Sequence, residues 1–129
     1  MQDRPNFAEL LESVRDFLQE EVSPTLTDHR TRFRTLVSIN ALTILGRELE
    51  QETRLVYEEA AALLELLGES RDVSDDLEAL HARVHELNAR LSARVRAGDV
   101  PDGALEHLLE VGAGKLRVAS PAYLKRYET

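Results

Sequence analysis

The fold class is decided by the stretch FAELLESVRDFL, which occupies residues 7–18 of a chain of 129 residues. Its apolar side chains recur at spacings of three and four residues, which is the period of one face of an α-helix. They are Phe7, Leu10, Leu11, Val14, Phe17 and Leu18. Pro5 suits the first helical turn, and Pro24 disfavours helical backbone at the residue before it. The stretch therefore predicts an amphipathic helix over residues 5–22.

Four further segments show the same helical period. We expect helices at about residues 29–50, 53–67, 75–97 and 101–118, followed by a short tail at 120–129. The segment 29–50 is apolar on nearly all sides, which is typical of a central helix. No proline or glycine separates it from the next segment, so one long, bent helix is the alternative to two helices.

Local signals mark several helix ends. Thr27 or Asp28 is placed to cap the second helix, and Asp72 or Ser74 to cap the fourth. Gly98 is placed to end the fourth helix. Gly112 and Gly114 weaken the fifth helix and favour a kink there.

The composition agrees with an all-α fold. The chain has 22 Leu but 2 Ile, with 43% hydrophobic and 5% aromatic residues, and leucine favours helices over strands. We expect one domain over residues 1–129, a compact bundle of four to five helices with the second helix central.

No cysteine is present, which excludes disulfides and thiolate metal sites. No apolar run reaches the roughly 18 residues of a membrane span, and no signal peptide is evident, so a cytoplasmic protein is expected.

The charged side chains occur in blocks within a net charge of −8. Arg83, Arg90 and Arg94 lie within about 20° of one line on the fourth helix, at 100° per residue. Such a stripe suits a phosphate group or an acidic partner. The alternative is a solvated face that is balanced by the acidic residues of segment 48–78. An acidic chain with two lysines argues against nucleic-acid binding.

Two motifs resemble sites of known chemistry, and both are incomplete. The segment GAGKL at residues 112–116 lacks the first glycine and the hydroxyl of a phosphate-binding loop. Glu78, His81 and His85 lie near one face of the fourth helix, but metal-binding bundles need further carboxylates from facing helices. We therefore expect no catalytic residue, no metal site and no cofactor.

Polar residues of the second helix form a candidate network. Asn40 interrupts the apolar surface of this helix, and a buried amide must find hydrogen-bond partners. Arg32, Arg47 and Glu48 lie along the same segment. The four side chains either fix the packing inside the bundle, which we favour, or face a partner.

The C-terminal tail concentrates aromatic residues that are scarce elsewhere. Tyr123 and Tyr127 flank two basic residues, and tyrosine and arginine are favoured at protein interfaces. The tail either contacts a partner or packs back on the bundle.

Four groups of short motifs resemble a known family. They are AELLE at 8–12 with FL at 17–18 and EEV at 20–22; RF at 32–33 with NAL at 40–42 and REL at 47–49; AR at 93–94 with RAG at 96–98; and KLxVAxPxYL at 115–124. In order and spacing they resemble a bacterial domain-of-unknown-function family of small helical proteins. The chain departs from this pattern in having no helix breaker after Leu49, and in having Gly112 and Gly114 where helix formers are usual.

The resemblance implies a role beside larger enzymes. Genes of this family typically lie next to an aminoglycoside-phosphotransferase-like kinase and an acyl-CoA dehydrogenase-like protein. The expected function is a non-catalytic accessory subunit of that kinase in hydroxyacyl-CoA catabolism. The alternative is a self-associating bundle that binds an acyl-CoA or another small acid through arginines such as Arg90 and Arg94. A metal-dependent bundle enzyme is a third, weaker interpretation.

Overall fold

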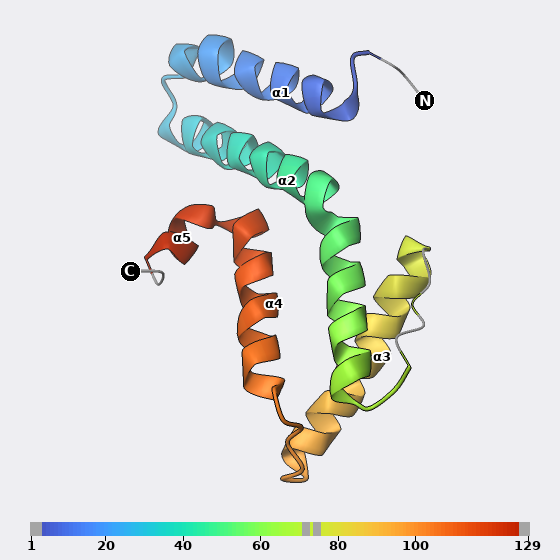
Figure 1. Ribbon diagram of the computed structural model, residues 1–129. Coiled ribbons are helices and arrows are strands. Elements are labelled where there is room, and N and C mark those ends of the chain that lie inside the picture. The colour runs from blue at the N-terminus through green and yellow to red at the C-terminus, as the bar shows by residue number, and fades with distance from the viewer. Residues whose placement is uncertain (1–3, 71–72, 74–75, 127–129) are drawn as a thin grey trace. The chain divides into compact units, whose positions relative to one another are not determined.

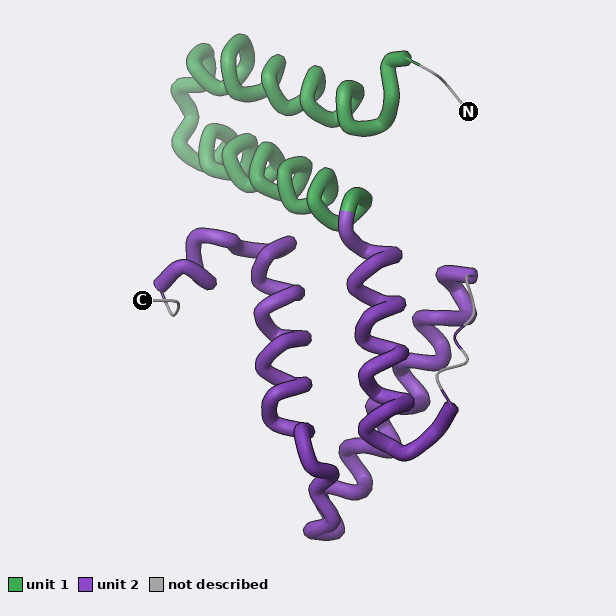
Figure 2. The backbone as a smooth tube through the Cα atoms, in the orientation of Figure 1, with its two compact units in different colours: residues 1–50 green, residues 51–129 purple. Residues whose placement is uncertain are grey.

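The structure is a computed structural model that describes residues 4–70, 73 and 76–126. This part of the chain forms five α-helices and no strand, which confirms the all-α prediction. The helices are α1 (Phe7–Phe17), α2 (His29–Leu66), α3 (Leu77–Arg96), α4 (Ala104–Ala119) and α5 (Pro121–Lys125) (Figure 1). They belong to two compact units, residues 1–50 and 51–129 (Figure 2).

The first unit contains α1 and the first half of α2, which lie side by side and antiparallel (Figure 1). Asn6 caps α1, because its side chain accepts a hydrogen bond from the backbone N–H of Glu9 at 2.9 Å. After α1 the chain continues as a π-helical turn, Leu18–Val22, and a 3-10 turn, Ser23–Thr25, which contains Pro24. The predicted end of the first helical segment near residue 22 is therefore close to the end of the π turn.

Asp28, one of the two predicted caps, stands immediately before α2. Its carboxylate accepts hydrogen bonds from the backbone N–H of Thr31 at 2.9 Å and from the hydroxyl of the same residue at 2.7 Å. These hydrogen bonds favour the ionised form and lower the pKa of Asp28. The start of α2 is thus fixed by its own first turn.

The helix α2 is continuous over 38 residues, where the sequence left one or two helices open. The junction contains Glu50, Gln51 and Glu52, which are good helix formers, and it has no glycine or proline. Just beyond it, Arg54 and Glu58 form an i, i+4 ion pair at 3.2 Å. The boundary between the units falls inside α2, so this helix contributes to both and has the predicted central place.

In the second unit the C-terminal half of α2 runs parallel to α3. Glu52 bonds His81 at 2.8 Å, and Glu59 accepts a hydrogen bond from Asn88 at 3.0 Å. Both pairs are separated by 29 residues, so the two helices advance in the same direction in constant register (Figure 1). Parallel neighbours need a longer connection than an antiparallel hairpin, and ten residues separate Leu66 from Leu77.

The core of the second unit is a leucine cluster between these helices and the start of α4. It consists of Leu63, Leu64, Leu87, Leu91 and Ala104, with Leu67, Val73 and Val84 packed against it. Among the described residues Asp76 caps α3, by accepting a hydrogen bond from the backbone N–H of Ala79 at 3.1 Å. The predicted caps Asp72 and Ser74 lie outside the described residues. Gly98 ends α3 as predicted, with the positive φ of 79° that glycine adopts without strain.

The helix α4 continues through both of its glycines, and a kink at these positions stays a prediction. Its buried residues are Ala104, His107, Gly114 and Val118, and its leucines 105, 108 and 109 are exposed. Gly114 faces α2, where a Cβ atom in its place would lie 3.2 Å from Cδ2 of Leu55. The side of α4 that carries these buried residues is therefore packed in the unit, and the side that carries the three leucines is exposed.

Candidate interaction surfaces

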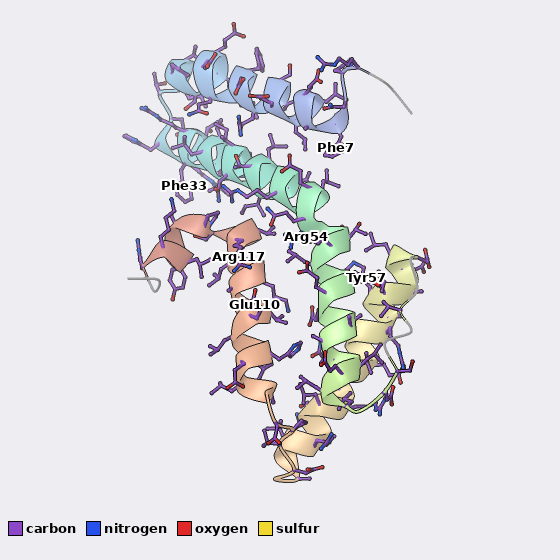
Figure 3. All side chains as sticks on the ribbon, in the orientation of Figure 1. Phe7, Phe33, Arg54, Tyr57, Glu110 and Arg117 are labelled. Atoms are coloured by element: carbon purple, nitrogen blue, oxygen red, sulfur yellow. The ribbon has the colours of Figure 1, made fainter. Side chains whose placement is uncertain are left out.

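The first half of α2 exposes a mixed basic and apolar face. At 100° per residue its members lie within an arc of about 120°. They are Arg30, Phe33, Arg34, Val37 and Asn40, all exposed, and are called here the outer face of α2. Phe33 is 67% exposed and points away from α1 (Figure 3), whereas Ile39, on the opposite side of the helix, is buried. This half of α2 thus packs on one side only within its unit.

The prediction that Asn40 and its polar neighbours form a network inside the bundle is corrected by this arrangement. Asn40 is exposed, as are Arg32 and Glu48, so the amide faces solvent, where water can satisfy it. The apolar pattern around this helix had suggested burial on all sides, but one side of it belongs to the outer face. Contact of these residues with a partner stays a prediction.

Arg47 lies in a shallow groove between α1 and α2. The groove has a volume of about 320 Å³ and an apolar floor that includes Leu11 and Leu42. Its rim carries two arginines, residues 15 and 47, and two glutamates, residues 12 and 50. The charged residues that line the groove are thus equal in number and opposite in sign.

The arginine stripe of α3 is bound by carboxylates of its own unit. Arg83 and Arg90 both bond Glu69, which follows α2, and Arg94 bonds Asp99 at 2.9 Å. The hydrogen bond from Arg90, aided by Arg83, lowers the pKa of Glu69. The hydrogen bond from Arg94 likewise lowers the pKa of Asp99. The geometry favours the interpretation of a solvated, internally balanced face over an open phosphate site.

The histidines of α3 do not assemble a metal centre with their neighbours. His81 bonds a single carboxylate, that of Glu52, and His85 is exposed. Within the described ranges, no group of three His, Asp or Glu side chains is arranged to hold a metal ion. None of the helices described is long and apolar enough to cross a membrane.

His107 is a buried histidine to which the sequence gave no partner. Its Nε2 atom has no hydrogen-bond partner among the described residues. Burial lowers the pKa of His107, and the nearby carboxylate of Glu59 opposes this shift only in part. The imidazole is therefore neutral in the folded chain at pH 7.

This histidine makes the free energy of unfolding depend on pH. Below its ordinary pKa of 6.5, His107 is protonated more readily in the unfolded chain than in the folded one, so acid favours unfolding. Its contribution is fully present above pH 6.5 and is lost as the pH falls toward the lowered folded value. The expected loss is about 1.4 kcal/mol for each unit by which folding lowers the pKa.

Urea unfolding between pH 7.5 and 5 measures this effect. His107→Gln is expected to flatten the profile, while His85→Gln, at an exposed position on α3, is expected to keep the wild-type slope. Equal slopes for the wild type and His107→Gln would contradict the assignment.

The C-terminal aromatic residues are described in part. Tyr123 lies on α5 and is 44% exposed, and Tyr127 lies outside the described residues. Contact of Tyr123 with a partner and packing on the bundle both stay predictions.

The surface feature that the sequence interpretation missed is the leucine stripe of α4. Leu105 and Leu109 are each 65% exposed and Leu108 is 51% exposed. Gly112 and Leu116, at half-buried positions, continue the same line. The sequence contained a signal for this stripe, because α4 has two apolar lines. One passes through Ala104, Gly114 and Val118, and the other passes through the leucines. When one of these two faces packs in the core, the other lies outside it.

Comparison with known proteins places the chain in a family. No curated protein and no solved structure is significantly similar to it. The family model described as "Domain of unknown function (DUF6285)" matches residues 24–123. The match covers most of the chain, from the 3-10 turn to α5, and leaves out α1 and the motifs at 8–22. This chain belongs to the DUF6285 family.

Proposed function

We propose that this chain is a non-catalytic accessory subunit that binds a phosphotransferase-like kinase of hydroxyacyl-CoA catabolism. The observation that carries the interaction role is the outer face of α2, where Phe33 is 67% and Val37 is 51% exposed. Covering an exposed large apolar side chain on association contributes about 1.5–3 kcal/mol. Covering this face with another protein is therefore expected to contribute favourably to the free energy of binding.

The charges on the outer face favour an acidic, partly apolar partner surface. Arg30 and Arg34 border Phe33 on the same side of the helix. Arginine and aromatic residues are the side chains most often found at the energetic centre of protein interfaces. Arg30 and Arg34 belong to the first unit, whereas the carboxylates that bind the arginines of α3 belong to the second.

The identity of the partner rests on the family resemblance. Because genes of the resembling family lie beside an aminoglycoside-phosphotransferase-like kinase, that kinase is the partner to test first. The accessory subunit would stabilise or activate the kinase, and the kinase would supply the catalytic residues.

Co-expression with the neighbouring kinase tests the proposal. Size-exclusion chromatography with light scattering is expected to give one complex. The double variant Phe33→Ser/Arg34→Glu is expected to weaken it at least tenfold, which corresponds to about 1.4 kcal/mol. The control Leu105→Ser removes an equally exposed apolar residue from α4 and is expected to leave the complex intact.

Two outcomes would contradict the proposal. Separate elution of the wild-type proteins would exclude a stable complex. Phosphorylation of a hydroxyacyl-CoA by this chain alone, in the presence of ATP, would show that it is not an accessory subunit.

A further inference from the structure

The leucine stripe of α4 has the symmetry of a self-complementary surface. At 100° per residue, its five members lie within an arc of about 100°. They are Leu105, Leu108, Leu109, Gly112 and Leu116. Three of the four leucines are more than half exposed, and the buried side of α4 is occupied by other residues. The stripe is therefore free of the core of its own unit.

We propose that this stripe binds the same stripe of a second copy of this chain, with the two α4 helices antiparallel. A two-fold symmetric interface requires one patch that is complementary to itself. Antiparallel pairing that places Leu105 over Leu116 of the second copy brings the whole stripe together. The two-fold axis then lies between residues 110 and 111.

In this register an exposed leucine of one copy lies opposite a glycine of the other copy. Leu109, which is 65% exposed, lies opposite Gly112 of the second copy. Gly112 has no side chain, and nothing lies within 4 Å of where its Cβ atom would be. The leucine side chain therefore enters open space, twice across the symmetric pair, which lets the two helices approach closely.

The charges of α4 agree with the same register. The helix carries Glu106 and Glu110 with Lys115 and Arg117, so the acidic and basic side chains balance within α4, although the whole chain has a net charge of −8. In an antiparallel pair each flank meets the same flank of the other helix. Arg117, which bonds Glu110 of its own chain at 3.5 Å (Figure 3), then lies within about 3 Å along the axis of Glu106 of the second copy.

This inference goes beyond the proposed function and uses a different surface. The outer face of α2 belongs to the first unit, and the leucine stripe belongs to the second. If the kinase does not bind the outer face of α2, the dimer can still be tested with variants of the leucine stripe, and the reverse also holds.

Analytical ultracentrifugation of the isolated full chain over a concentration series tests the dimer. The wild type is expected to show a monomer–dimer equilibrium, and Leu109→Glu is expected to raise the dissociation constant at least tenfold. Phe33→Ser, at the equally exposed position in the first unit, is the matched control and is expected to dimerise as the wild type does. A monomer at all concentrations, or dimers unaffected by Leu109→Glu, would overturn the proposal.

The register is tested by disulfide trapping, because the chain has no cysteine of its own. Leu105→Cys and Leu116→Cys proteins, mixed and oxidised, are expected to give the mixed disulfide. Leu105→Cys alone is expected to give none, because its two copies lie roughly 16 Å apart along the axis, beyond the reach of a disulfide. Efficient self-linking of Leu105→Cys would indicate a parallel pair and overturn the register.

Charge reversal gives a second test of the antiparallel arrangement. Glu106→Arg and Arg117→Glu are each expected to weaken the dimer, and the double variant is expected to recover most of the loss. Circular dichroism of each variant, unchanged from the wild type, shows that the helices persist. Absence of recovery in the double variant would contradict the proposed pairing.

Discussion

Leu87→Ala is expected to lower the free energy of unfolding of the second unit by about 3–5 kcal/mol. Leu87 is completely buried, in contact with a cluster that includes Leu63 and Leu91. The substitution removes apolar contacts and leaves a cavity that rigid helices on several sides cannot close. Since domains are typically stable by only about 5–15 kcal/mol, this is the largest loss we expect from a single substitution.

Urea denaturation followed by circular dichroism measures the effect. The matched control is Leu105→Ala, the same change at a residue that is 65% exposed, with an expected change within about 0.5 kcal/mol at a concentration where the chain is monomeric. Comparable losses for both variants would show that Leu87 is not at the centre of the core.

Gly114→Leu is expected to destabilise the second unit by about 1–3 kcal/mol. A Cβ atom alone at this position would lie 3.2 Å from Leu55 Cδ2, a tight contact. Gly114 is buried, so the remaining carbons of leucine require the Leu55 side chain or the helices to shift. This steric cost opposes the gain of about 1 kcal/mol that any helix former has over glycine inside a helix.

The neighbouring glycine provides the control. At Gly112 nothing lies within 4 Å of an added Cβ, so Gly112→Leu in the monomeric chain is expected to raise the free energy of unfolding by about 0.5–1 kcal/mol. Opposite signs for two identical changes two residues apart would establish the close approach at Gly114. A stabilising effect at both positions would contradict it.

Much of the local structure was predictable from the sequence. The apolar spacing of residues 7–18 predicted the first helix, the carboxylate of Asp28 supplied one of two predicted caps, and Gly98 ends α3 as expected. Each of these features depends on residues within one or two helical turns, so the chain carries the information locally. The continuity of α2 was left open, because propensity is weak evidence where no helix breaker is present.

The candidate sites were less predictable, because each depends on which elements become neighbours. Arg90 was a candidate ligand for an external phosphate, and the structure supplies Glu69 from a distant turn. Asn40 was expected inside the bundle, and it lies on an exposed face instead. His107 was not among the candidate residues, and burial lowers its pKa, so that it too links stability to pH.

The sequence by itself determined the helical class, because the period of its apolar residues and its leucine-rich, cysteine-free composition are properties of the linear chain. Only the tertiary structure decided which side of a helix is buried when two apolar sides compete. In α4 Gly114 faces Leu55 of α2 and permits a tighter approach than a leucine at that position would. Burial of that side leaves the larger apolar side exposed, and close packing between helices, which no spacing along the chain records, is the physical reason.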